Sequence, residues 1–384
     1  MNPFSFRTVP HVLMEAGVAR RLGEVLAQRF AVGRVCVVTD APLYRSGLLD
    51  AALASLKAGG WQVQVVSDVQ ADPPEHVVEA ICAQAQSQGT DLVLGFGGGS
   101  SMDVAKLVAI RLGSDQPLQE MYGVDKVRGE RLPLVLVPTT AGTGSEVTPI
   151  SIVTTGATTK SGIVSRQLYG DMAILDAELT LGLPAPITAA TGIDAMVHAI
   201  EAYTSKRLKN PLSDHLAVLA LRLLMGNLVK VCENGQDLQA RSAMLLGSML
   251  AGQAFANAPV AAVHALAYPL GGRFHLPHGL TNALVLLPVM EFNLPAAAAS
   301  YAQLAREVLP GVQGDHAAQA NALLGHLREL IAATRLPLRL RDHGVKETDI
   351  PQLAADAMLQ TRLLVNNPRD VGEADAVAIY QQAY

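Results

Sequence analysis

Four residues near the middle of the chain have the side chains and the spacing of a metal site: Asp194, His198, His264 and His278. Asp194 and His198 stand at positions i and i+4 of TGIDAMVHAIEAY, which share one face of a helix. His264 lies on an expected short helix, and a Gly-Gly and a Leu-Pro pair then return the chain to present His278 at a new helix start. One carboxylate and three imidazoles suit a divalent transition metal and leave a position for a substrate oxygen. The alternative for any single histidine here is a packed core residue.

A glycine-rich loop upstream is the second candidate site. An apolar strand is expected at 91–96, and GGGS at 97–100 follows it before a helix that opens at Ser101. Glycines let the backbone approach a phosphate, and the free N–H groups of a helix start suit a pyrophosphate. The spacing is neither G-x-G-x-x-G nor a Walker loop, so a tight turn without a ligand is the alternative. A second loop, TTAGTGSEVT at 139–148, interleaves hydroxyl side chains with glycine and can wrap a dinucleotide. Its alternative is a Thr/Ser-rich surface turn.

Composition sets the broad class. The 384 residues suggest two domains, and 50% hydrophobic residues are ample for two cores. The net charge of −5, without a basic patch, argues against binding to nucleic acid or to an anionic membrane surface. We find no signal peptide and no uninterrupted apolar run long enough to span a membrane. Three widely spaced cysteines, Cys36, Cys82 and Cys232, are expected to be reduced, as in a cytoplasmic protein.

The hydrophobic pattern changes along the chain and predicts two domains. Strands are expected at 34–39, 62–67, 91–96, 132–137 and 172–175, with helices at 15–30, 47–58, 75–88 and 101–112 between them. This alternation predicts a mostly parallel, Rossmann-like α/β sheet in residues 1–182. A breaker-rich joint at 181–186 follows, and residues 183–384 are predicted to be all-helical, with helices at 187–204, 209–232, 236–256, 279–294, 297–308 and 315–335. We expect the active site where the glycine loop and the metal residues meet.

Taken together, these segments resemble the iron-containing (group III) alcohol dehydrogenase family. The motifs occur in the family's order and extend over nearly the whole chain: GGGSSMDVAK at 97–106, PTTAGTGSEVT at 138–148, GIDAMVHAIEAY at 192–203, HALAYPLGG with LPHGLTNA within 264–283, and NNPRDV at 366–371. The resemblance implies an N-terminal α/β dinucleotide-binding domain and a helical metal domain. It also implies that Asp194, His198, His264 and His278 are the metal ligands, with Fe(II) as the ion and Zn(II) as the alternative that the same donors would accept.

The residues around the first strand and the two loops predict the cofactor. Asp40 ends the first strand, where a carboxylate can bind the ribose hydroxyls and repel a 2′-phosphate, so NAD is favoured over NADP. The alternative is that Asp40 caps the next turn. The resemblance implies that Gly97, Gly98 and Ser100 contact the pyrophosphate and that Thr139, Thr140 and Thr143 line the adenine and phosphate region. Asp103 is a further candidate cofactor-binding residue. Lys160 is a candidate phosphate or ribose contact, or else a solvated lysine.

One position departs from the common family pattern. Four residues after His264, where many members carry a histidine with a proton-relay or substrate-positioning role, this chain has Tyr268. A phenol is a poorer relay at neutral pH than an imidazole. His275 is a candidate substitute, with an ordinary polar loop residue as the alternative, and Tyr268 then only shapes the pocket. Phe255 and the small residues before it are expected to line that pocket.

These observations predict an NAD(H)-linked, metal-dependent alcohol dehydrogenase or aldehyde reductase, acting on a short or medium aliphatic alcohol, diol or hydroxyacid. The metal would act as a Lewis acid and the nicotinamide would take the hydride. Two alternatives stay open: a hydroxyacid–oxoacid transhydrogenase that retains its cofactor, and a lyase similar to dehydroquinate synthase. The latter should carry more basic residues near its metal motifs, whereas Arg273 is the only Lys or Arg between 264 and 278. A cytoplasmic homodimer or higher homo-oligomer is expected.

Overall fold

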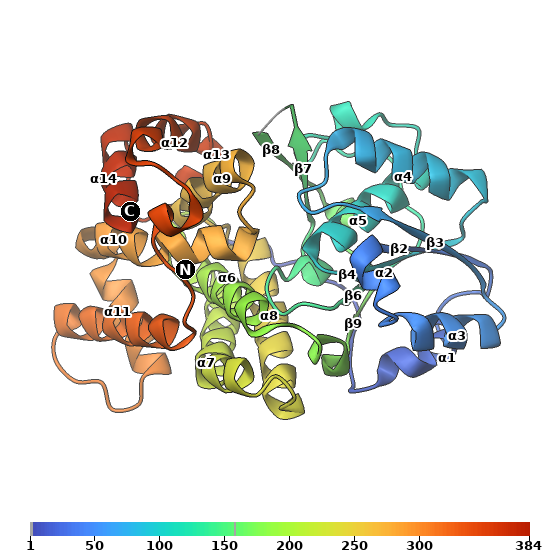
Figure 1. The fold of residues 1–384 in the computed structure, drawn as a ribbon, viewed down its shortest axis with the longest axis horizontal. Helices are drawn as coiled ribbons and strands as arrows, with labels where there is room; N and C mark the ends of the chain where they lie inside the picture. Colours follow the sequence, from blue (N-terminus) through green and yellow to red (C-terminus); the bar gives the residue numbers. More distant parts are fainter. Residues whose placement is uncertain (1–2, 157–158) are drawn as a thin grey trace. The chain divides into compact units, whose positions relative to one another are not determined.

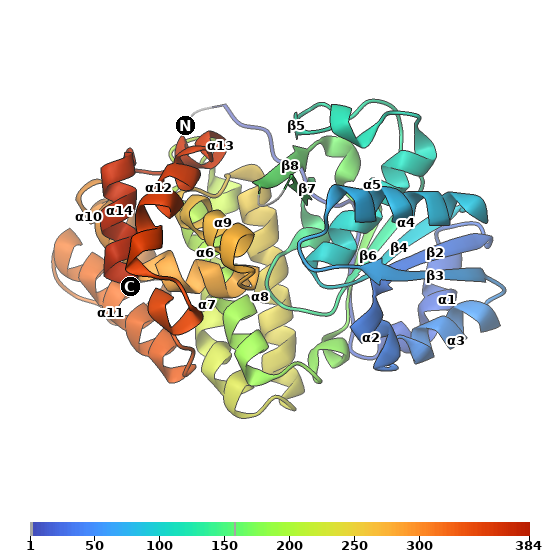
Figure 2. The same cartoon turned by 45° about the horizontal axis from the view of Figure 1, so that its top comes forward.

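The chain forms two compact units, which we call the sheet unit and the helical unit. The computed structural model describes residues 3–156 and 159–384. The sheet unit comprises Thr8–Thr140 and Gly144–Gly182, and the helical unit comprises Leu183–Tyr384 with the N-terminal segment up to Arg7 and the short segment Ala141–Thr143. The division expected at 182/183 assigned these two short segments to the N-terminal domain, whereas in the structure they belong to the helical unit. Figures 1 and 2 show the elements of each unit in two views.

A six-stranded parallel sheet organises the sheet unit. Its order is β1 (Val12–Met14), β9 (Met172–Leu175), β6 (Leu134–Pro138), β4 (Leu92–Gly97), β2 (Arg34–Asp40) and β3 (Gln62–Val69), and every neighbouring pair is parallel. The central strands VCVV, LVLGFG and LVLVP are apolar on both faces, as a sheet covered on both sides requires. The predicted parallel α/β sheet is therefore confirmed, and only the short edge strand β1 was not expected.

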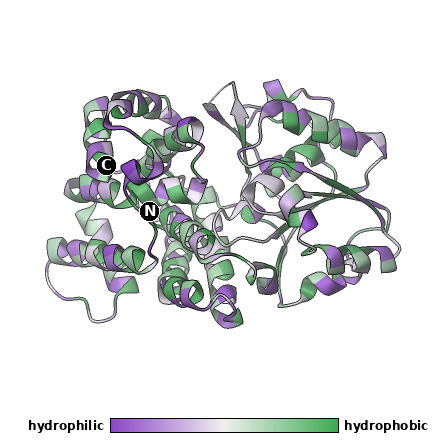
Figure 3. Ribbon diagram, in the orientation of Figure 1, coloured by the Kyte–Doolittle hydropathy of each residue, from purple (hydrophilic) through white to green (hydrophobic). Residues whose placement is uncertain are grey.

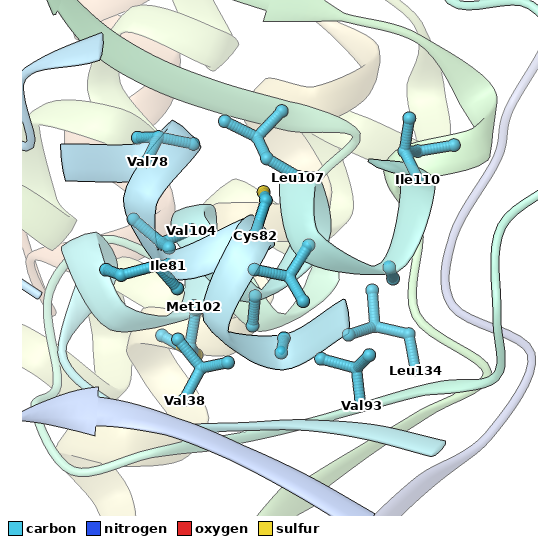
Figure 4. Packing of buried hydrophobic residues seen from close by; sticks show 14 of the residues in the cluster. Val38, Val78, Ile81, Cys82, Val93, Met102, Val104, Leu107, Ile110 and Leu134 are labelled. Atoms are coloured by element: carbon cyan, nitrogen blue, oxygen red, sulfur yellow. The ribbon is translucent and has the colours of Figure 1, made fainter. Parts of the chain in front are cut away.

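Alternate residues of the same strands enter two different cores. One core joins α4 (Glu75–Ser87) and α5 (Gly99–Gly113) to the sheet, and Figure 4 shows Val38, Val93 and Leu134 of the strands facing helix residues such as Ile81 and Leu107. The other core joins the opposite sheet face to η1 (Val18–Arg21), α1 (Leu22–Ala27) and α3 (Asp50–Ala58). The expected single helix at 15–30 is thus a short 3₁₀ turn followed by a short α-helix.

A small second sheet was missed by the sequence analysis. It consists of β5 (Gly123–Val124), β8 (Thr159–Val164) and β7 (Ile150–Thr155), with β7 and β8 antiparallel. Its strands mix Ser, Thr and Lys with apolar residues, so the alternation is weak. The fully buried Lys106 of α5 ties this sheet to the helix, because its ammonium donates to Ser145 Oγ and to the Ile150 carbonyl, each at 2.7 Å.

The helical unit is all-α, as expected. Its helices are α6 (Ala185–Thr204), α7 (Pro211–Glu233), α8 (Leu238–Asn257), α9 (Ala262–Phe274), α10 (His278–Val308), α11 (His316–Ala333), α12 (Ile350–Met358), α13 (Thr361–Leu364) and α14 (Glu373–Ala383). The two helices expected at 279–294 and 297–308 are one helix that continues through Pro288 and Pro295. The three C-terminal helices were not predicted. Figure 3 shows that the helices carry both hydrophobic and hydrophilic residues.

Two helices of this unit, α7 and α10, are long and apolar enough to cross a membrane by length and composition alone. Both pack against other helices of the unit: α7 against α6 and α8, and α10 against α6, α9 and α11. The core helices of soluble proteins meet the same criterion, so two such helices are only weak evidence for a membrane span.

Candidate active site

The structure brings the four predicted metal residues together in the helical unit. Asp194 and His198 lie one turn apart on α6, His264 lies in the first turn of α9, and His278 is the first residue of α10. One ligand atom from each lies within 4.8 Å of all the others. Asp194 Oδ1 is 3.9 Å from His198 Nε2, 3.9 Å from His264 Nε2 and 3.6 Å from His278 Nε2. This spacing leaves room for one ion among four donors.

Burial and charge prepare these donors for a cation. Asp194, His198 and His264 are buried, whereas the His278 side chain is 36% exposed, which leaves one side of the cluster accessible. Burial lowers the pKa of His198 to about 3, so its imidazole is neutral and has a lone pair to donate. Burial opposes ionisation of Asp194, but His198, His278 and His264 outweigh it and lower the pKa of this carboxyl. Three imidazole nitrogens and one carboxylate fit a divalent transition metal.

Hydrogen bonds orient two of the histidines toward the centre. His198 Nδ1 lies 3.2 Å from the Gly142 carbonyl oxygen, and His264 Nδ1 lies 2.7 Å from Glu201 Oε2. When Nδ1 donates to these acceptors, the lone pair is on Nε2, which faces the other donors. Sequence reasoning missed Glu201, although a signal was present. Glu201 follows Asp194 by seven residues and His198 by three, so an acidic residue lies on the same helix face.

Asn282 was also missed, and it lies inside the cluster. It is fully buried, one turn after His278 on α10. Its side-chain nitrogen donates to Asp194 Oδ1 at 2.5 Å and lies 3.3 Å from both His264 Nε2 and His278 Nε2. Within the described residues its Oδ1 has no hydrogen-bond partner. A buried polar atom without a partner is costly, so this amide indicates a site adapted to more than the protein's own groups.

Of the predicted pocket and proton-relay residues, Tyr268 and Phe255 lie near the metal cluster, whereas His275 does not. Tyr268 is close to the cluster, with ring centroids 6.5 Å from His264 and 6.1 Å from His278. Phe255 stacks on His198 at 4.3 Å and gives the cluster an apolar neighbour. His275 is exposed and occupies the left-handed C-cap of α9, at φ 54°, and none of the contacts among the described residues links it to the cluster. Of the two candidates, only Tyr268 therefore lies next to the candidate metal residues in the described part of the chain.

Three of the predicted dinucleotide residues, Asp40, Gly98 and Ser100, lie together at the carboxyl ends of β2, β3 and β4. A cavity of about 620 Å³ is bounded there by residues 40–42, 67–71 and 98–101. In the sheet, β3 and β4 lie on opposite sides of β2. The chain passes from β2 to β3 in one direction and from β4 to β6 in the other, so the strand order reverses between β2 and β4. Ligands of open parallel sheets bind at such a switch point. Gly97 is needed there, because a Cβ would lie 2.7 Å from Ser101 Oγ.

The individual cofactor candidates differ in the hydrogen bonds they make within the protein and in the unit to which they belong. Asp40 lines the cavity, and its Oδ1 accepts the Leu43 backbone N–H at 2.8 Å, so it also caps α2 (Ala41–Arg45). The Thr139 N–H donates to the Gly97 carbonyl at 3.0 Å, which holds the second loop against the first. Thr140 lies beside Gly98, while Thr143 belongs to the segment in the helical unit.

Two candidates are committed to structural bonds. Asp103 accepts from Ser145 Oγ at 2.5 Å and from the Ile152 N–H at 2.9 Å, and thereby joins α5 to β7. Lys160 Nζ lies 2.6 Å from Asp72 Oδ1, and its side chain is only 7% exposed. The structure thus gives both residues a role within the sheet unit, and a cofactor contact by either one stays a prediction.

Comparison with known proteins identifies the family. The model for the iron-containing alcohol dehydrogenase matches residues 10–177, and the model for the C-terminal region of the Fe-containing alcohol dehydrogenase family matches residues 188–384. The chain belongs to the iron-containing alcohol dehydrogenase family. Membership makes it an oxidoreductase of the alcohol dehydrogenase type, and it confirms the predicted fold class of an α/β region followed by a helical region.

Individual members show how closely the chain follows the family. It is 41% identical to the long-chain-alcohol dehydrogenase 1 of Geobacillus thermodenitrificans (strain NG80-2) over 93% of this chain and 91% of that protein. Among solved structures, a 1,3-propanediol oxidoreductase superposes with a TM-score of 0.95 at 34% identity, with full coverage of both chains. The sulfoacetaldehyde reductase of Bifidobacterium kashiwanohense, solved in complex with NAD⁺, superposes with a TM-score of 0.88 at 27% identity, covering 100% of this chain and 99% of that one.

Proposed function

We propose that this family member is a metal-dependent, NAD(H)-linked alcohol dehydrogenase or aldehyde reductase acting on a short or medium aliphatic alcohol, diol or hydroxyacid. The observation that carries the proposal is the convergence of Asp194, His198, His264 and His278 in a buried cluster with one accessible side. Fe(II) is the proposed ion, in keeping with the family, and Zn(II) is the alternative for the same donors.

The protein's own contribution is to hold, orient and shield. A divalent ion in this cluster supplies Lewis acidity toward an alcohol or carbonyl oxygen. Asp194 would offset part of the charge of the cation, and the three imidazole nitrogens would complete the donor set. Phe255 and Tyr268 cover parts of the cluster with ring surface, which excludes water and favours an aliphatic substrate chain.

Cofactor choice is proposed from the cavity in the sheet unit. Asp40 places a carboxylate at the end of β2, where it can accept hydrogen bonds from ribose hydroxyls and repel a 2′-phosphate. Gly97, Gly98 and Ser100 precede or open the first turn of α5, whose free N–H groups suit a pyrophosphate. The NAD⁺ complex of the sulfoacetaldehyde reductase supports NAD as the cofactor. Thr139, Thr140, Thr143, Asp103 and Lys160 complete the proposed set.

A transhydrogenase with a retained cofactor is the second candidate, because Tyr268 stands where many members carry a histidine and lies beside His264 and His278. Small-molecule substrates, a cytoplasmic location and a homodimer or higher homo-oligomer are part of the proposal. The proposal does not include binding to nucleic acid or to a membrane.

The test is metal analysis of anaerobically purified protein, followed by a panel of alcohols and aldehydes with NAD(H) and NADP(H). We expect about one divalent ion per chain, net NADH formation from an aliphatic alcohol, and loss of turnover on chelation with recovery on adding Fe(II). Hydride exchange between a hydroxyacid and an oxoacid without net NADH would identify the transhydrogenase instead. Full turnover of the metal-free protein would overturn the metal-dependent proposal.

A further inference from the structure

Helix α9, which carries His264, begins without a cap of its own. The first N–H groups of a helix have no partner inside the helix and need an acceptor from elsewhere. The residue before α9 is Ala261, whose side chain cannot accept a hydrogen bond, and no acidic residue lies in the first turn. Residues 261–264 are all buried, so their N–H groups need hydrogen-bond acceptors from the protein instead of from bulk water.

Glu201 of α6 supplies that cap from a distant part of the chain. Its Oε2 accepts the Ala261 N–H at 2.9 Å, and its Oε1 accepts the Val263 N–H at 2.7 Å. A negative charge near the N-terminus of a helix also interacts favourably with the positive end of the helix dipole. Glu201 is only 4% exposed, so the carboxylate depends on these bonds to compensate for its own burial.

The same carboxylate also holds a donor of the proposed metal centre. Glu201 Oε2 lies 2.7 Å from His264 Nδ1, which leaves Nε2 as the nitrogen that faces Asp194. A cation on Nε2 would make the opposite N–H a stronger donor, and a hydrogen bond to a carboxylate strengthens with the charge on its donor. His198 differs, because its Nδ1 faces a neutral carbonyl, that of Gly142.

We infer that Glu201 is a positioning residue of the metal centre, which couples metal binding to the start of α9. One carboxylate caps the helix and fixes the donor nitrogen of His264 on that helix. Metal binding tightens the bond from His264 to Glu201 and so stabilises the first turn of α9, and Glu201 in return raises the affinity for the metal. This inference rests on the metal centre proposed above and goes beyond it by assigning a residue outside the ligand set.

The test uses Zn(II), which has no redox chemistry of its own, as the probe. Zinc affinity is measured by competition with a chromophoric chelator for the parent, Glu201→Gln, His264→Ala and the double variant. Glu201→Gln keeps the side-chain shape but removes the charge and one acceptor, and we expect it to weaken zinc binding by ~10–100-fold. In the His264→Ala background the same change should have no further effect on affinity, because the residue through which Glu201 acts is gone.

Amide hydrogen exchange gives the second readout. Zinc should slow exchange in the first turn of α9 in the parent, and should do so much less in Glu201→Gln. Asp176→Asn is the matched control, since Asp176 is a buried carboxylate in the sheet unit that likewise accepts backbone N–H groups, including those of Gly17 and Ala19. It should leave zinc affinity and the exchange of α9 unchanged. If Glu201→Gln does not fold, Glu201→Asp, which keeps the charge on a shorter side chain, should fold and show a smaller loss of affinity.

The outcomes separate the two proposals. If the parent binds no zinc, the metal centre itself is wrong and this inference fails with it. If the parent binds zinc but Glu201→Gln or, where that does not fold, Glu201→Asp binds it equally tightly, only the inference is overturned. It is likewise overturned if the loss of affinity is the same with and without His264, because Glu201 would then act through general stability.

Discussion

In the helical unit the candidate metal centre is built from side chains, whereas in the sheet unit the candidate dinucleotide site is built largely from backbone. The metal centre gathers a carboxylate, three imidazoles and an amide in a buried cluster whose members touch one another. The candidate dinucleotide cavity is open, and the glycines that line it, Gly98 and Gly99, follow the carboxyl end of β4. We infer from this difference that a single substitution in the metal centre can abolish metal binding. A single substitution in the dinucleotide cavity should remove only the contact made by that side chain.

The largest expected effect is at the metal centre. His264→Ala removes a donor and the partner of Glu201, so we expect loss of most bound metal and nearly all activity while the fold persists. Metal content by elemental analysis, activity and circular dichroism are measured together. His316→Ala, an exposed histidine at the start of α11, is the control and should behave as the parent does. Stoichiometric metal and normal turnover in His264→Ala would show that the ligand assignment is wrong.

A smaller loss is expected from the amide inside the cluster. Asn282→Ala removes the hydrogen bond to Asp194 without removing a ligand, so zinc affinity should fall by ~10-fold, as expected for a residue that hydrogen-bonds to a metal ligand. Asn293→Ala is the matched control, because Asn293 is a buried amide on the same helix that pairs with Asn367. Equal zinc affinities in the two variants would remove Asn282 from the centre.

The sheet unit should respond to substitution with a change of preference instead of a loss of function. Asp40→Asn keeps an acceptor for the cap of α2 but removes the charge that opposes a 2′-phosphate. We expect kcat/KM with NADP to rise relative to NAD by ~10-fold, which corresponds to ~1.4 kcal/mol. Asp40→Gly removes both roles, so comparing the two variants separates charge from capping. An unchanged NADP/NAD ratio in both would take Asp40 out of the cofactor site.

The smallest effects concern the proton path. Tyr268 contacts the histidine rings of the cluster, whereas His275 is exposed and apart from them. We therefore expect Tyr268→Phe to change KM or substrate preference modestly, and His275→Ala to leave both kcat and its pH dependence in place. The measurement is kcat and KM against pH for the parent and both variants. A pH profile displaced in His275→Ala would instead identify this residue as the proton carrier.

The sequence by itself determined the parts of this protein that depend on local periodicity. The i, i+4 spacing of Asp194 and His198 placed both on one helix face, and the apolar strands followed by glycine predicted the parallel sheet and its loops. It failed where local signals are weak: the polar hairpin of β7 and β8, the short C-terminal helices, and the prolines that α10 accommodates without ending.

Only the tertiary structure decided which residues support these sites. Glu201 and Ala261 are separated by 60 residues, so no local pattern could reveal that a carboxylate on α6 caps α9. Likewise, Asp103 and Lys160 have the side chains of cofactor contacts, but folding gives them partners within the sheet unit. The physical reason is that spacing along the chain fixes which way a side chain points from its own helix or strand, while the groups it meets there come from packing between distant segments.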